Sequence, residues 1–124
     1  MDTTELIDRY CLAWSDPQPA QRAVLLEQVW AAGATYTDPL AHATGSAELL
    51  AHITRVQARR PRGKVVRTSV VDIHHGIARF AWKAVDAAGA TVIHGIDIAF
   101  LSADGAKIER ILGFFGALEP LPPR

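Results

Sequence analysis

The second half of the chain consists of four β-prone runs that follow one another with only short turns between them. Each run is rich in β-branched or alternating apolar residues, and the separating segments mostly contain glycine. Because strands joined by tight turns pair with their neighbours in sequence, this pattern predicts an antiparallel meander. The four predicted strands span residues 64–73, 77–86, 91–101 and 106–115.

The first half is predicted to be mainly helical. Asp2 and Glu5 have the spacing of a capping box, which opens a first helix, and Asp16–Pro19 ends it and begins a second. In the second helix, Val24 and Val29 are expected to face inward. The predicted elements are helices over 3–14, from 19 to about 33, and over 46–58, with a short strand over 34–38 that ends before Pro39.

Helices followed by a meander predict an α+β domain, with three N-terminal helices packed on a curved, mostly antiparallel sheet. The 124 residues are expected to form a single domain, 1–124, with a proline-rich tail at 117–124. Residues of both parities in the 91–101 run are mostly apolar, so each face of the sheet needs a cover. The helices can cover one face, and we predict that a second copy covers the other in a homodimer.

The overall composition argues against several classes of protein. The formal net charge is zero, which gives no global field for nucleic acid or an acidic membrane surface. No apolar run is long enough to span a membrane, and the acidic N-terminus lacks a signal-peptide pattern, so a cytoplasmic location is expected. Cys11 is the single cysteine and is expected to be a reduced core residue.

The histidines and a basic cluster are candidates for metal binding and nucleic-acid binding, but neither role is expected. The histidines lack the spacing of zinc ligands, so no metal site is predicted. His94 has the opposite strand parity to Asp97 and is expected to face the dimer interface. A basic cluster spans the end of the third helix and the residues after it, without interleaved aromatic residues, which favours a solvated helix end over a nucleic-acid interface. This cluster comprises Arg55, Arg59, Arg60, Arg62, Lys64 and Arg67.

Asp97 stands in the middle of the apolar 91–101 run, where the pattern indicates burial. A carboxylate buried there charged and alone would cost several kcal/mol, so it must be paired or protonated with a raised pKa. Acids in such surroundings are found preferentially at functional sites, although structural networks contain them too. Asp97 is therefore the first candidate for chemistry.

Two further residues are candidates to join Asp97 at one cavity. Asp38 ends the predicted short strand, where its side chain can project into a cavity, although turn formation alone would also explain an Asp-Pro pair. Tyr10 lies on the apolar stripe of the first helix, and its hydroxyl needs a partner if it is buried. Two carboxyl groups and a phenol around an apolar cavity would suit proton abstraction beside a carbonyl group.

The order of elements and several short motifs resemble the NTF2-like (SnoaL-like) superfamily. Within it the chain is similar to ketosteroid isomerases, over roughly residues 3–116. The resemblance implies a cone-shaped fold with an apolar pocket, no metal, no cofactor and a dimer. The motifs are Tyr10-x-x-x-Trp14, Ala34-Thr-Tyr-Thr-Asp-Pro39, Thr44-Gly-Ser46, Gly95-Ile-Asp97 and Ile111-Leu-Gly-Phe-Phe115.

The same resemblance implies a role for each candidate. Asp38 would be the base that moves the proton, Tyr10 the tyrosine that binds the oxyanion, and Asp97 a protonated acid that binds the same oxyanion. The chain departs from the isomerases in having only Tyr36 as a further tyrosine, and in carrying His52 on the third helix where an apolar wall is expected. The residues expected to line the substrate pocket are Trp14, Tyr36, His52 and Trp82.

These observations support two classes of function. The first is a cofactor-independent acid–base enzyme acting on a small apolar carbonyl compound, steroid or polyketide-like, through an allylic double-bond shift by way of a dienolate. A SnoaL-like cyclase or a dehydratase that uses His52 is the nearest enzymatic alternative. The second class is a non-catalytic dimeric module that binds a small apolar molecule, because one fold supports many functions.

Overall fold

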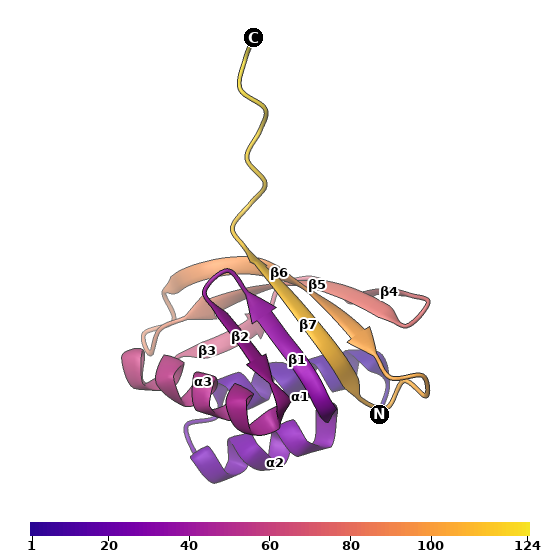
Figure 1. Ribbon diagram of the computed structural model, residues 1–124. Coiled ribbons are helices and arrows are strands. Elements are labelled where there is room, and N and C mark those ends of the chain that lie inside the picture. The colour runs from indigo at the N-terminus through magenta and orange to yellow at the C-terminus, as the bar shows by residue number, and fades with distance from the viewer.

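A computed structural model describes residues 1–124, and three helices lie against one face of a curved sheet (Figure 1). The helices are α1 (Thr3–Ser15), α2 (Pro19–Val29) and α3 (Gly45–Arg59). The strands are β1 (Trp30–Asp38), β2 (Ala41–Thr44), β3 (Lys64–Arg67), β4 (Asp72–His74), β5 (Ile77–Val85), β6 (Thr91–Leu101) and β7 (Ile108–Phe115).

The strands form one mixed, mostly antiparallel sheet in the order β2-β1-β7-β6-β5-β3, with β4 also paired to β5. The neighbours β5, β6 and β7 form the predicted antiparallel meander. The β1–β7 pair is parallel and joins the two halves of the chain. The predicted α+β architecture of three helices on a mostly antiparallel sheet is confirmed.

The main hydrophobic core lies between the helices and the inner face of the sheet. Helix α1 packs against β3 and α2, while α3 packs against β1 and β2. Leu6, Ile53 and Ile111 are among the fully buried side chains that these elements bring together.

No helix has the length and apolar character that crossing a membrane requires. After Gly116 the chain leaves the body of the domain as an extended tail without helix or strand (Figure 1).

The first helix begins as its capping pattern predicts, whereas the end of the second differs from expectation. The Asp2 carboxylate accepts a hydrogen bond of 2.8 Å from the Glu5 amide. Helix α2 ends at Val29, and β1 begins at once. Gly33 does not end the helix: it lies within β1 at φ 73°, where the pairing with β7 shifts register. Val24 is 47% exposed, so its expected inward position was also wrong.

Two strand predictions also needed correction. The segment expected to be a loop through His42 forms β2, which pairs with β1 through the register Thr37–His42. The predicted run over 64–73 is divided into β3 and β4. Between them the Ser69 hydroxyl accepts a hydrogen bond of 2.8 Å from the Ala81 amide, in place of a backbone partner. Side chains that supply such bonds interrupt regular strand pairing without any change in hydrophobicity.

A close approach of Trp82 to Gly95 determines the inner face of the sheet. The two residues are opposite each other in the β5–β6 pair. A Cβ atom at position 95 would lie 2.6 Å from the Trp82 ring and would also clash with the Phe114 carbonyl oxygen. Glycine is therefore required for the indole to lie across β6.

We predict that Gly95→Ala destabilises the protein by about 1–3 kcal/mol, because the added methyl group must displace the indole or the neighbouring strand. Denaturant unfolding followed by far-UV circular dichroism measures this change, and near-UV circular dichroism reports displacement of the indole. Unchanged unfolding and an unchanged near-UV spectrum would contradict this account of position 95.

Candidate functional site

A cavity of about 630 Å³ lies between the inner face of the sheet and helices α1 and α3, and its volume is within the range of small-molecule sites. Most of its lining is apolar. All seven residues predicted from the sequence line this one cavity: Tyr10, Trp14, Tyr36, Asp38, His52, Trp82 and Asp97. They come from five different elements, α1, β1, α3, β5 and β6.

The Asp97 carboxyl group is buried and has one hydrogen-bond partner. The Trp82 indole Nε1–H donates to Asp97 Oδ1 across 2.9 Å. Burial raises the pKa of Asp97 to about 7, the Trp82 hydrogen bond opposes this rise, and the charge of Asp38 adds to it. Because the indole occupies only Oδ1, Oδ2 is available to carry a proton toward a ligand.

Asp38 has a different environment, in which both carboxylate oxygens accept hydrogen bonds. The Tyr36 hydroxyl donates to Oδ2 across 2.5 Å, and the Leu40 amide donates to Oδ1 across 2.7 Å. The Leu40 bond belongs to the turn that joins β1 to β2, so Asp38 also has the turn role that its Asp-Pro pair suggests. Burial and the adjacent Asp38 raise the pKa of Tyr36, which keeps its phenol protonated as a donor.

The Tyr10 hydroxyl is buried and has no hydrogen-bond partner. Its ring stacks on Trp30, with centroids 5.8 Å apart, and meets Trp14 edge-on at 6.5 Å. Burial and the charge of Asp97 raise the pKa of Tyr10, so the group remains a neutral donor. An unsatisfied buried hydroxyl typically costs about 1–3 kcal/mol, which a ligand oxygen at this position would offset.

Gly113 brings the two carboxyl groups to one region of the sheet. In β7 it is paired with Asp97 of β6, and it adjoins β1 near Asp38. A Cβ atom at position 113 would lie 2.9 Å from Asp97 Oδ1 and 3.4 Å from the Asp38 Cβ. Only a residue without a side chain leaves room for both acids here.

Aromatic rings form one wall of the cavity. Trp14, Tyr36 and His52 form a mutual cluster, with the Trp14 centroid 5.3 Å from Tyr36 and 5.6 Å from His52, and the last two 5.9 Å apart. His52 is buried, and burial lowers its pKa; Asp38 opposes this effect, whereas Arg55 and Arg59 reinforce it. His52 is therefore mainly neutral at pH 7 and extends the aromatic wall.

Sequence reasoning missed some residues that shape this cavity. Gly113 was included only as part of a motif, because the closeness of the two acids follows from strand pairing rather than from local sequence. Arg55, Arg59 and Arg60 were assigned to a solvated helix end, yet all three line the cavity. Their helical spacing from His52 was the available signal. His94 is exposed and does not line the cavity, as its parity predicted.

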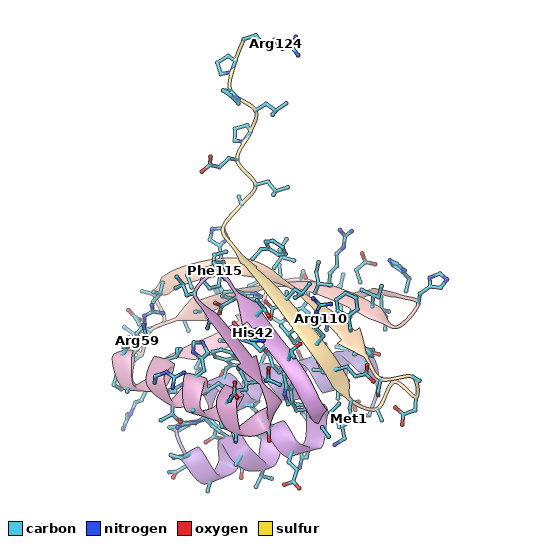
Figure 2. The ribbon with its side chains drawn as sticks, in the orientation of Figure 1. Met1, His42, Arg59, Arg110, Phe115 and Arg124 are labelled. Carbon is cyan, nitrogen blue, oxygen red and sulfur yellow. The ribbon has the colours of Figure 1, made fainter.

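No three side chains of histidine, cysteine, aspartate or glutamate lie close enough together to form a metal-binding group. Figure 2 shows how the side chains fill the space between the helices and the sheet. The polar residues that line this mostly apolar cavity include carboxyl, phenol, indole and imidazole groups and three arginines. Such a set can donate and accept protons and hydrogen bonds.

Solved structures of several bacterial proteins are similar to this one. A candidate isomerase of the SnoaL-like family from Agrobacterium tumefaciens is 27% identical with a TM-score of 0.84, covering 91% of this chain and 96% of that one. An NTF2-like protein of unknown function from Cytophaga hutchinsonii is 14% identical with a TM-score of 0.69, covering 94% and 91%. A candidate ketosteroid isomerase from Kribbella flavida is 17% identical with a TM-score of 0.62, covering 98% and 83%.

No family model matches the sequence, and no curated protein matches it. The structural similarity nevertheless extends over nearly the whole chain. The chain therefore has the NTF2-like (SnoaL-like) fold, and its structural neighbours include proteins similar to ketosteroid isomerase, as the sequence motifs indicated.

The raised pKa of Asp97 predicts a pH-dependent stability. The folded protein holds the proton up to about pH 7, whereas an unfolded aspartate loses it near pH 4. The free energy of unfolding should therefore fall between about pH 4 and pH 7, by roughly 4 kcal/mol from this group, and the slope should end above pH 7.

Asp97→Asn provides the matched comparison, because it keeps an acceptor for the Trp82 indole and removes the titration. Denaturant unfolding across this pH range should show a steeper loss of stability for the wild type than for the variant. Identical pH profiles for the two proteins would contradict a raised pKa at Asp97.

Proposed function

We propose that this NTF2-like domain is a cofactor-independent acid–base isomerase of small apolar carbonyl compounds. The reaction is a shift of a β,γ double bond into conjugation with the carbonyl group, through a dienolate intermediate. The observation that carries the proposal is the buried Tyr10 hydroxyl, which has no protein partner and lines the same cavity as two carboxyl groups.

Asp38 is the proposed base. Its carboxylate removes a proton from the carbon between the carbonyl group and the double bond, and returns it to the far carbon of the dienolate. In the first step the electron pair of the broken C–H bond becomes the enolate double bond, and a C=O pair moves to the oxygen. In the second step the π pair of the original double bond forms the new C–H bond, the enolate pair becomes the conjugated double bond, and the C=O bond is restored. The hydrogen bonds from Tyr36 and Leu40 hold the carboxylate in place for both transfers.

Tyr10 and protonated Asp97 are the proposed donors to the dienolate oxygen. Both are buried, neutral hydroxyl donors, and burial is the main cause of the raised pKa of each. Fixed donors in such surroundings stabilise developing negative charge more strongly than water-exposed donors do. The Trp82 indole orients the Asp97 carboxyl group through Oδ1.

The solved structures support this proposal in part. One similar protein is described as a candidate isomerase of the SnoaL-like family, and another as a candidate ketosteroid isomerase. Those descriptions concern proteins at 27% and 17% identity, so they favour this chemistry without assigning it to the present chain.

Incubation with a β,γ-unsaturated ketosteroid, and in parallel with a smaller bicyclic β,γ-enone, tests the proposed chemistry by the rise of conjugated-enone absorbance. We expect Asp38→Asn to lower turnover by about 10²–10⁴-fold, because it removes the base. Tyr10→Phe should lower it by about 10²-fold, because it removes one oxyanion donor. Asp72→Asn is the matched control, since Asp72 is exposed and lies outside the cavity.

Absence of turnover by the wild type on both substrates, or equal turnover by Asp38→Asn, would contradict the isomerase. A cyclase or dehydratase is the second candidate, favoured by the buried, mainly neutral His52 in the cavity wall. In that case substrate consumption would depend on His52, and His52→Gln would lose more activity than Asp38→Asn. Binding without any consumption would indicate the non-catalytic ligand-binding module.

We further propose that the domain forms a homodimer through the outer face of the sheet. Phe114 is 60% exposed and pairs with Ile96, which is 46% exposed, and Val92 is exposed on the same face. The next pair on this face is Ile98 with Leu112. A contiguous exposed apolar face of this kind favours a protein interface, and a second copy would place matching apolar rows against each other.

Analytical ultracentrifugation tests the dimer. The wild type is expected to sediment as a dimer, and Ile96→Glu as a monomer, because a charge at the centre of the face opposes burial. Val24→Glu is the matched control, since Val24 is similarly exposed on α2, away from the sheet. A monomeric wild type would rule out this interface.

A further inference from the structure

One face of α3 runs along the cavity and changes from aromatic to basic along its length. His52, Arg55, Val56 and Arg59 have the i, i+3, i+4 and i+7 spacing of one helix face, and all four line the cavity. Arg60, immediately after the helix, lines it too. Figure 2 shows Arg59 at the end of α3, at the edge of the domain.

These arginines have no acidic partner in the protein. The two ion pairs of the structure are Arg67 with Asp8 and Arg79 with Asp72. The side chains of Arg55, Arg59 and Arg60 form neither an ion pair nor a side-chain hydrogen bond. Three arginines whose guanidinium groups carry unpaired N–H donors therefore line the cavity.

The charges that line the cavity are unequal. Its only acidic residues are Asp38 and Asp97, and burial favours the neutral form of Asp97. Three arginines thus outnumber the two acids of the lining. Their field extends into the cavity, since Arg55 and Arg59 both act to lower the pKa of His52.

The helix dipole explains only part of this arrangement. Cations near the last turn of a helix are favourable, which accounts for Arg59 and Arg60. Arg55 lies one turn earlier, on the face that carries His52 into the cavity. A solvated helix end would not require the basic side chains to share the cavity-lining face of the helix.

We infer that the ligand of this cavity is an amphiphilic anion: an apolar body that carries a carboxylate or phosphate group bound by Arg55, Arg59 and Arg60. Guanidinium groups bind such planar or multi-oxygen anions through paired N–H donors. The inference rests on the proposed function for the other end of the molecule, where the carbonyl oxygen would meet Tyr10 and Asp97. It narrows the substrate from apolar carbonyl compounds in general to those with an acidic group.

An anionic end would also orient the ligand. The Asp38 carboxylate would repel a ligand anion, whereas the arginines would attract it. A bound acid would therefore place its charged group beside α3 and its carbonyl group toward the neutral donors of Tyr10 and Asp97. Such fixed orientation is what proton transfer between two defined carbons requires.

Binding of matched phenols tests the inference without turnover. A phenol hydroxyl can occupy the position of the dienolate oxygen, so 2-naphthol and 6-hydroxy-2-naphthoate differ only in the acidic group. 4-Hydroxybiphenyl and 4′-hydroxybiphenyl-4-carboxylate provide a longer pair. In fluorescence titrations at low salt, at least one carboxylate should bind about tenfold more tightly than its neutral partner. This preference should shrink as salt is raised, because the arginines are exposed.

The arginine variants locate the effect. We define the carboxylate preference as the affinity of the acidic probe divided by that of its neutral partner. This ratio should fall toward one in Arg55→Gln, in Arg59→Gln and in the variant with all three arginines replaced, while the affinity for 2-naphthol is unchanged. Arg62→Gln is the matched control, because Arg62 is near in sequence but does not line the cavity. Equal affinity of the neutral and acidic probes in the wild type would overturn the inference. Loss of the carboxylate preference in Arg62→Gln to the same extent as in Arg55→Gln would also overturn the inference.

A naphthol that carries a phosphate ester in place of the carboxylate identifies which anion the site prefers. Binding of either acidic probe more tightly than the neutral naphthol supports the inference. The outcomes are also separable from those of the isomerase. Turnover that depends on Asp38 but no carboxylate preference would leave the isomerase standing and overturn the anion site. A carboxylate preference that depends on the arginines, with no turnover of the neutral enones or of a β,γ-enone that carries a carboxylate, would leave the anion site standing and overturn the isomerase.

Discussion

The hydrogen bond from the Trp82 indole to the buried Asp97 carboxyl group is the interaction on which the arrangement of the cavity depends. It occupies one oxygen of the acid and leaves the other free. The indole can reach that oxygen because Gly95 has no side chain beneath the ring, and the carboxyl group fits because Gly113 has none beside it. A buried charged acid without such a partner would be costly, whereas this arrangement leaves Oδ2 of Asp97 free for a ligand.

Burial gives the polar groups of the cavity different roles although they lie in one space. It favours the protonated form of Asp97 and the neutral forms of Tyr10 and His52. Asp38 instead accepts hydrogen bonds on both oxygens, from Tyr36 and from the backbone. Neutral donors and a bonded carboxylate thus face the same volume, while the arginines of α3 add positive charge along one side. This separation of environments is the physical basis of both proposals.

The fold was largely predictable, because its strongest signals are local and periodic. Because successive side chains of a strand point to opposite faces, the sequence correctly placed Asp97 on the inner face of β6 and His94 on the outer face. Errors arose where a local pattern has two structural uses. Gly33 can end a helix or form a bulge in a strand, and here its positive φ lies within β1. The β2 strand was missed because its pairing with β1, rather than its short sequence, makes it a strand.

The sequence by itself determined which chemical groups the protein has and which of them the chain must bury, because strand and helix periodicity assign each side chain to a face. It therefore identified Tyr10, Asp38 and Asp97 as candidates. Only the tertiary structure decided that these groups share one cavity, since the parallel β1–β7 pair brings residue 38 beside strands that begin dozens of residues later. It also decided that the Tyr36 hydroxyl bonds Asp38 and that exposed arginines of α3 border the same cavity. Distances between remote residues follow from packing, which no local pattern records.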